Sequence, residues 1–114
     1  MAEQDFDVFA AQAAEAAAVM KSLSHEGRLR VLCYLAEAGE MSAGALSGLV
    51  GLSQSALSQH LAKLREDGLV ATRKAAQSVF YRIADPKVLD LLSALHGIYC
   101  PALVVVKSKE TPVD

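Results

Sequence analysis

The stretch SQSALSQHLAKLREDG, residues 53–68, constrains the fold of this chain most, because both of its ends carry helix signals. Ser53 is a suitable N-cap, since its hydroxyl can accept a hydrogen bond from a free backbone N–H of the first turn. Gly68 is a suitable stop. Between them, four apolar residues recur at helical spacing and form the predicted buried face: Ala56, Leu57, Leu61 and Leu64. The stretch therefore predicts an amphipathic helix.

A second short helix is predicted directly before this one, over SAGALSGLVG, and it ends at Gly51. Only GL joins the two, and a pair of short helices with so tight a connection forms a helix-turn-helix, here over about residues 42–68. The exposed side of the later helix begins with polar residues, and a lysine follows them. These side chains have the length and polarity to contact base edges and phosphates: Gln54, Ser55, Ser58, Gln59, His60 and Lys63.

Two alternating segments follow, LVATRKA and SVFYRIA, and the dipeptide AQ separates them. Both are rich in β-branched or aromatic residues, a pattern that predicts a β-hairpin over about residues 69–84. A hairpin directly after a recognition helix forms the wing of a winged helix. Three basic residues on the wing extend the predicted DNA-binding surface: Arg73, Lys74 and Arg82.

The charge distribution supports a DNA-binding surface, although the net charge is -2. Residues 1–20 hold four acidic residues and no basic one, whereas residues 63–87 hold six basic and three acidic residues. A local basic face is what contact with phosphates requires. An ordinary solvated surface would show similar counts, so the prediction depends on the wing and on the polar start of the helix.

Two helices are predicted before the helix-turn-helix. The Ala-rich residues 7–22 predict a first helix with small side chains suited to close helix packing. Residues 24–39 predict a second helix, with Ser24 as N-cap and Gly39 at its end. Cys33 falls on the apolar face of this second helix and is expected to point inward.

A last helix is predicted over residues 86–105, with Asp85 as N-cap and Pro86 in the first turn, where its missing N–H has no consequence. This helix has more apolar residues than one face can hold. We therefore expect one side to pack on its own domain and the other on a second subunit. The predicted fold is mainly α with a small β-hairpin, a winged helix-turn-helix that dimerises through its first and last helices.

Length and composition suit one domain over residues 1–114, with enough hydrophobic residues, 53%, for a real core. The longest apolar run, PALVVV, is too short to span a bilayer, and the acidic start MAEQDFD has no signal region. We therefore expect a cytoplasmic protein with no membrane partner. In that compartment two cysteines indicate metal binding, redox sensing or plain burial rather than a structural disulfide.

The succession of HEGRLRVLCYL, LSQSALSQHLAKLREDGLV, a basic wing and a C-terminal helix resembles the ArsR/SmtB family of bacterial winged-helix repressors over nearly the whole chain. The resemblance implies a homodimer that binds double-stranded operator DNA until an inducer releases it. Members mostly sense metals or metalloids. The metalloid-type C-x-C site is absent, since the matching region is GEMSAGAL, and the spacing of Asp90, His96 and Cys100 does not match the zinc-type site.

The remaining pattern, one cysteine in RVLCYL and one in GIYCP, resembles the dithiol branch of the SqrR/BigR type. This resemblance implies that Cys33 and Cys100 sense persulfides and related reactive sulfur species, such as glutathione persulfide. A sulfur-bridged crosslink between them would release operator DNA and derepress sulfide-detoxification genes. No cofactor is implied.

Alternative roles for these residues remain open at the level of the sequence. A metal-responsive repressor of the same fold would use Cys33, His96 and Cys100, although a tetrahedral zinc site needs four ligands, or three and a water. Plain burial would also account for Cys33, because Cys is among the residues most often buried. The ordinary role for His96 is that of a core or dimer-face histidine.

Two rival classes of function are less well supported. A small thiol oxidoreductase would need a C-x-x-C motif, a Gly-rich phosphate loop or a nucleophile with an adjacent base, and the sequence offers none, so no enzymatic activity is expected. A winged-helix module that binds only proteins would not need a basic wing or the polar start of the helix over residues 53–68.

Overall fold

The computed structural model describes residues 3–100, with side chains from residue 5 onward. Within residues 3–100, five helices and three short strands follow one another in the order α1 (Glu3–Leu23), α2 (Glu26–Ala38), β1 (Met41–Ser42), α3 (Ala43–Val50), α4 (Gln54–Glu66), β2 (Val70–Ala75), β3 (Ser78–Ile83) and α5 (Pro86–Tyr99). This confirms the predicted class, mainly α with a small hairpin, and adds strand β1. Within the described part of the chain, no helix has the length and apolar character needed to cross a membrane.

The hairpin of β2 and β3 is antiparallel, with Val70 opposite Ile83 at its base and Ala75 opposite Ser78 at its tip. Ala76, in the turn, has a φ of 56°. Strand β1 pairs with the other edge of β3, so the sheet order is β1-β3-β2. A strand of two residues has no alternation that a sequence pattern could reveal, which explains why the prediction lacked it.

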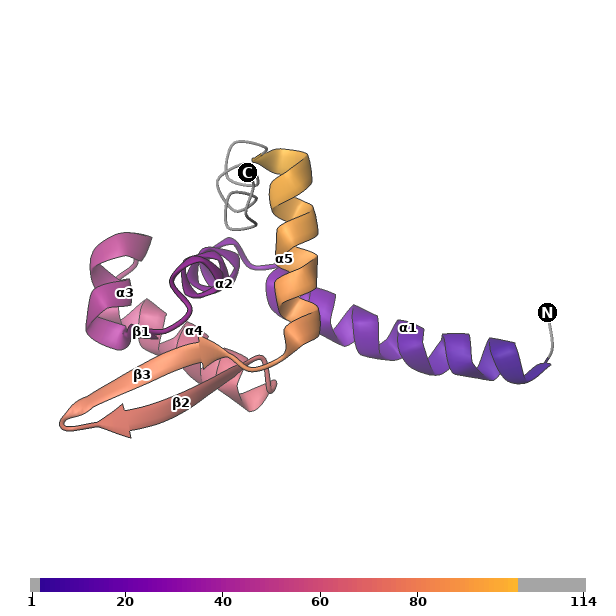
Figure 1. Ribbon diagram of the computed structural model, residues 1–114, viewed down its shortest axis with the longest axis horizontal. Helices are drawn as coiled ribbons and strands as arrows, with labels where there is room; N and C mark the ends of the chain where they lie inside the picture. The colour runs from indigo at the N-terminus through magenta and orange to yellow at the C-terminus, as the bar shows by residue number, and fades with distance from the viewer. Residues whose placement is uncertain (1–2, 101–114) are drawn as a thin grey trace, which may run out of the picture.

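The hydrophobic core lies where α2, α3 and α4 meet and is closed by the base of the hairpin and one side of α5 (Figure 1). Three of the four residues on the predicted face of α4 are fully buried, and Ala56 is half-buried. The core consists of aliphatic side chains: Leu23, Val31, Leu32, Leu35, Leu46, Val50, Leu57, Leu61, Leu64, Leu69, Val70, Val88 and Leu92. This packing fixes the orientation of α4, because its buried side points toward α2 and its polar side toward solvent.

Helix α1 projects from the rest of the domain as a long arm, and α5 stands beside its inner end (Figure 1). Large apolar side chains on both helices are exposed to solvent in the single chain: Phe6, Val8, Phe9 and Met20 on α1, and Leu89, Leu91, Ile98 and Tyr99 on α5. The predicted last helix extended to residue 105, but residues 101–105 lie outside the described part of the chain.

One predicted cap is wrong. The N-cap of α2 is His25 rather than Ser24, because Nδ1 of His25 accepts a hydrogen bond from the backbone N–H of Gly27 at 2.9 Å. The hydroxyl of Ser24 instead donates to the carbonyl of Lys21 at 2.7 Å, at the end of α1. An imidazole nitrogen thus takes the role that the sequence suggested for a serine hydroxyl.

Candidate functional site

Helix α4 begins with an ordered cap and presents an exposed polar face. Ser53 accepts a hydrogen bond from the backbone N–H of Ala56 at 3.1 Å, which satisfies one free donor of the first turn. The predicted DNA-contacting residues Gln54, Ser55, Ser58 and Gln59 are all exposed. Because they lie in the first half of one helix, the structure brings these four side chains together on one surface.

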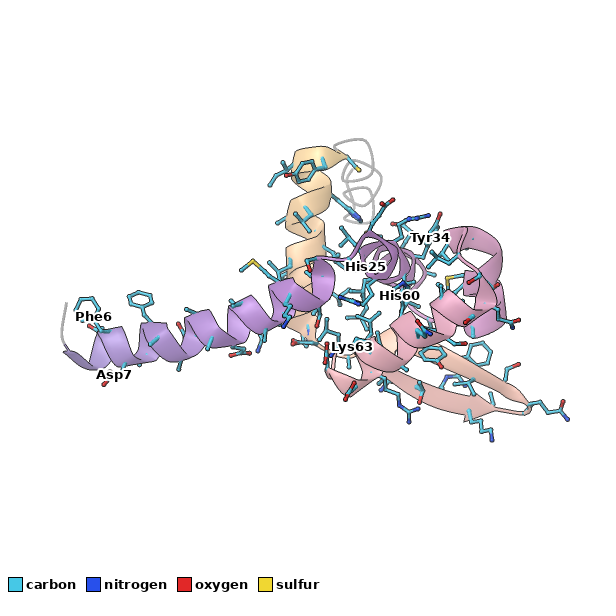
Figure 2. All side chains as sticks on the ribbon, turned by 180° about the vertical axis from the view of Figure 1, so that it is seen from behind. Phe6, Asp7, His25, Tyr34, His60 and Lys63 are labelled. Atoms are coloured by element: carbon cyan, nitrogen blue, oxygen red, sulfur yellow. The ribbon has the colours of Figure 1, made fainter. Side chains whose placement is uncertain are left out.

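Lys63 lies one turn further along α4 (Figure 2). Its Nζ pairs with Oδ1 of Asp67 at 3.5 Å. Asp67 also accepts a hydrogen bond from Ser22 of α1. That hydrogen bond is the main reason why the pKa of Asp67 lies below its ordinary value, with Lys63 and Arg28 adding to the effect. These contacts connect the end of α4 to the end of α1.

The basic wing is attached to the domain through Arg73. Its guanidinium donates two hydrogen bonds of 2.8 Å to the carboxylate of Glu40 and lies 4.8 Å from the ring centre of Phe80. The hydrogen bond from Arg73 lowers the pKa of Glu40. Lys74 and Arg82 are exposed on the hairpin. Sequence reasoning missed Glu40, because it lies 33 positions from Arg73 in the chain.

His60 points away from the exposed polar face of α4. Its ring lies 4.4 Å from that of His25, centre to centre, at the start of α2 (Figure 2). Gly27 makes room for this contact, since a Cβ at that position would lie 2.8 Å from Nε2 of His60. Burial lowers the pKa of His60, and the nearby His25 and Arg28 lower it further. The structure therefore separates His60 from the other residues predicted to contact DNA.

Acidification is expected to destabilise the protein through His60. Its folded-state pKa lies below the ordinary value of 6.5, so the unfolded chain binds the proton more readily. The resulting stabilisation is fully present above pH 6.5 and is lost as the pH falls through the folded-state pKa. Urea unfolding at about pH 7.5 and about pH 5 should show a smaller pH-dependent loss of stability for His60→Gln than for the wild type. Equal losses would contradict this role.

The two cysteines lie on the same cavity. Cys33 is half-buried on α2, and Cys100 is exposed directly after α5. The cavity between the two helices has a volume of about 640 Å³ and is lined largely by apolar groups. Its lining consists of Leu29, Arg30, Cys33, Tyr34, Glu37, Leu95, His96, Tyr99 and Cys100. A volume of this order is typical of small-molecule sites.

His96 is the buried polar residue of this cavity. Its Nε2 lies 3.3 Å from the Sγ of Cys33, although the two residues are 63 positions apart. Burial is the main cause that raises the pKa of the Cys33 thiol, and the nearby Cys100 raises it further. Within residues 3–100, no group of three or more His, Cys, Asp and Glu residues is arranged to hold a metal ion.

Comparisons with known proteins place the chain in a family. The sequence model of the arsR family of bacterial regulatory proteins matches residues 25–72. The transcriptional activator HlyU of Vibrio cholerae is 51% identical over 89 residues, which cover 78% of this chain and 82% of that protein. The chain belongs to the arsR family. The biofilm growth-associated repressor of Agrobacterium fabrum is 44% identical over 89 residues, which cover 78% of this chain and 75% of that protein.

Solved structures of similar regulators have the same fold as this chain. The repressor BigR of Xylella fastidiosa has a TM-score of 0.76 and 41% identity, and the match covers 88% of this chain and 98% of that chain. Reduced HlyU of Vibrio cholerae also has a TM-score of 0.76, with 48% identity and coverage of 81% and 96%. As an arsR-family member with this winged helix-turn-helix, the protein is a DNA-binding transcriptional regulator and not an enzyme.

Proposed function

We propose that this arsR-family regulator is a cytoplasmic repressor whose two cysteines, Cys33 and Cys100, respond to persulfides and related reactive sulfur species. One observation carries the proposal: both thiols line one largely apolar cavity between α2 and α5. In the reduced state the protein binds operator DNA. A sulfur bridge between the two cysteines releases the DNA and derepresses the controlled genes.

A persulfide can supply both the sulfur and the oxidising power. A cysteine thiol loses its proton, and the thiolate attacks the outer sulfur of a persulfide RSSH. The S–S bond breaks, and the leaving thiolate RS⁻ takes up the proton that the cysteine lost, to become RSH. Once both cysteines carry one added sulfur, the terminal sulfur of one attacks the Sγ of the other. This step forms a trisulfide and expels hydrogen sulfide. Every sulfur and hydrogen atom is then accounted for without a further oxidant.

We infer that the working unit is a homodimer. Both α1 and α5 expose large apolar side chains that a second copy of the chain would cover. Two recognition helices in such a dimer would contact half-sites about 34 Å apart, one turn of DNA. Because α5 also forms one wall of the cysteine cavity, a change there would reach the dimer face directly.

Helix α2 connects the cysteines to the DNA-binding surface. It carries Cys33, and it packs against α4 as well as α5. A covalent bridge between α2 and the end of α5 would favour one packing arrangement of these helices over another. In a dimer, this change would alter the spacing of the two α4 helices and weaken their simultaneous contact with the operator.

The names of similar proteins fit parts of this proposal. The relative from Agrobacterium fabrum and the BigR structure are both described as repressors. HlyU is described as an activator, and one of its structures is of the reduced protein. Transcription in vitro from a template with the operator tests repression directly.

The exposed residues of the wing should determine much of the salt dependence of DNA binding. For Lys74→Gln combined with Arg82→Gln, the slope of log K against log salt should fall by about 4, because each cation neutralises one phosphate and the dimer carries two copies of each residue. The control is Lys21→Gln, which removes one positive charge from an exposed position on α1 and should leave the slope unchanged. Fluorescence anisotropy over a salt series gives the slopes. An unchanged slope in the wing variant would remove these two residues from the DNA-binding surface.

The proposed function is tested by DNA release. Fluorescence anisotropy on the DNA upstream of the protein's own gene should show roughly 5–150-fold weaker binding after treatment with glutathione persulfide, and a reductant should restore binding. Treatment with zinc or other thiophilic metals in the same assay tests the metal-responsive alternative with Cys33, His96 and Cys100. Release by metal and not by persulfide would overturn the proposal.

A further inference from the structure

The position of His96 is fixed by the packing of α5. It follows Val88 and Leu92 at intervals of four residues, and all three are buried against the domain. The next position at the same interval is Cys100, whose backbone N–H donates to the carbonyl of His96 at 2.8 Å. The imidazole is thereby held one helical turn from Cys100, and its Nε2 is in contact with the other thiol, Cys33, at 3.3 Å.

We propose that His96 accepts the proton of the Cys33 thiol and so makes Cys33 the first sulfur to react and Cys100 the second. This proposal rests on the proposed function for its sulfur donor. The contact between His96 and Cys33 itself does not depend on that donor.

The half-buried position of Cys33 creates the need for a base. Burial favours the neutral thiol, whereas the thiolate is the form that attacks a persulfide. An imidazole nitrogen at hydrogen-bond distance can remove that proton, since imidazoles exchange protons near neutral pH. Cys100 is exposed to solvent. It lies at the C-terminal end of α5, where the helix dipole disfavours negative charge.

The proton returns in the same reaction. His96 takes the proton from Cys33, and the thiolate forms a bond with the outer sulfur of the persulfide. The S–S bond of the donor breaks, and its leaving thiolate takes the proton from the imidazolium of His96. The step ends with a persulfide on Cys33, a free thiol from the donor and a neutral imidazole, so atoms, electrons and protons balance.

Other polar and titratable side chains line the same cavity as the imidazole of His96. From α2, Arg30, Tyr34 and Glu37 line the cavity, and from α5, Tyr99 and Cys100 do so. The guanidinium of Arg30 is directed to the carbonyl of Val50 at 2.7 Å and to Glu26 at 3.5 Å. Among the residues that the structure describes, His96 provides the polar side-chain contact to the sulfur of Cys33.

The test uses Cys100→Ser, so that Cys33 is the remaining thiol, and measures its alkylation by iodoacetamide as a function of pH. A base at His96 should give a rate that rises near neutral pH and then levels, before a second rise as the thiol itself ionises above its ordinary pKa of 9.0. In Cys100→Ser combined with His96→Gln, the first rise should disappear, and the rate near neutral pH should fall about tenfold or more.

Two outcomes would overturn the proposal. One is a profile of Cys100→Ser with a single rise above pH 9.0, a measurement that needs no change at His96 and stays decisive if His96→Gln does not fold. The other is the same profile with and without His96 in folded protein. Because alkylation uses neither DNA nor persulfide, failure of the proposed function would leave this result intact. Normal DNA release with a flat profile near neutral pH would remove only the role of His96.

Discussion

Replacing Leu57 by Ala is expected to lower the free energy of unfolding by about 2–5 kcal/mol, because the change removes buried methyl groups and leaves a cavity. Leu57 lies on α4 with 2% of its surface exposed, where this helix packs on the rest of the core. Urea unfolding of the reduced protein at one fixed concentration gives the value, since dimerisation would make stability depend on concentration.

Leu49→Ala is the matched control for Leu57→Ala. Leu49 lies on the neighbouring helix α3 with 52% of its surface exposed, so the same chemical change should alter stability by no more than about 0.5 kcal/mol. Equal losses in the two variants would contradict the described packing of α4. The Leu57→Ala variant should also bind DNA more weakly wherever its folded fraction falls.

Replacing either cysteine by serine is expected to abolish the response to persulfide while leaving the DNA affinity of the reduced protein within about twofold. Neither Cys33 nor Cys100 lies on the polar face of α4 or on the wing, so their loss removes no proposed DNA contact. A bridge needs two sulfur-bearing residues, and each single variant has one. Anisotropy before and after treatment with glutathione persulfide measures both quantities.

The two single variants should still differ in the persulfide that they accumulate on the remaining cysteine. Cys100→Ser should keep a persulfide on Cys33, visible as one added sulfur atom by intact mass, yet remain bound to DNA. Full release of DNA from either variant would rule out the two-thiol bridge. Loss of DNA binding in the reduced variants would mean that the cysteines support the fold and not the response.

The helix-turn-helix and the wing were predictable because their signals are local. Ser53, the apolar stripe of α4 and the alternating hairpin segments each determine structure within a few residues of the chain. Helix α4 also lies inside residues 25–72, which the arsR-family model matches, whereas most of the hairpin lies beyond them. Local patterns could also identify Cys33 and Cys100 as residues of interest.

The contacts that shape the two candidate sites were not predictable from local patterns. The pairs His96 with Cys33, Arg73 with Glu40, and Ser22 with Asp67 join residues 33 to 63 positions apart. Helical spacing placed His60 among the residues predicted to contact DNA. In the structure its side chain instead packs against α2, where it contacts the ring of His25 in the space that Gly27 leaves. The cap at His25 was missed because an imidazole is not among the usual capping side chains.

The central claim is a sulfur bridge between Cys33 and Cys100 in protein that has released its DNA, and a peptide analysis of that released fraction tests it most directly. Trypsin cuts the chain into residues 31–63 and 88–107, each with one of the two cysteines. After persulfide treatment without reductant, the account predicts one linked species made of both peptides, with a mass that includes at least one bridging sulfur atom beyond a disulfide, and its disappearance on reduction. Release of DNA with the two peptides unlinked would contradict the account.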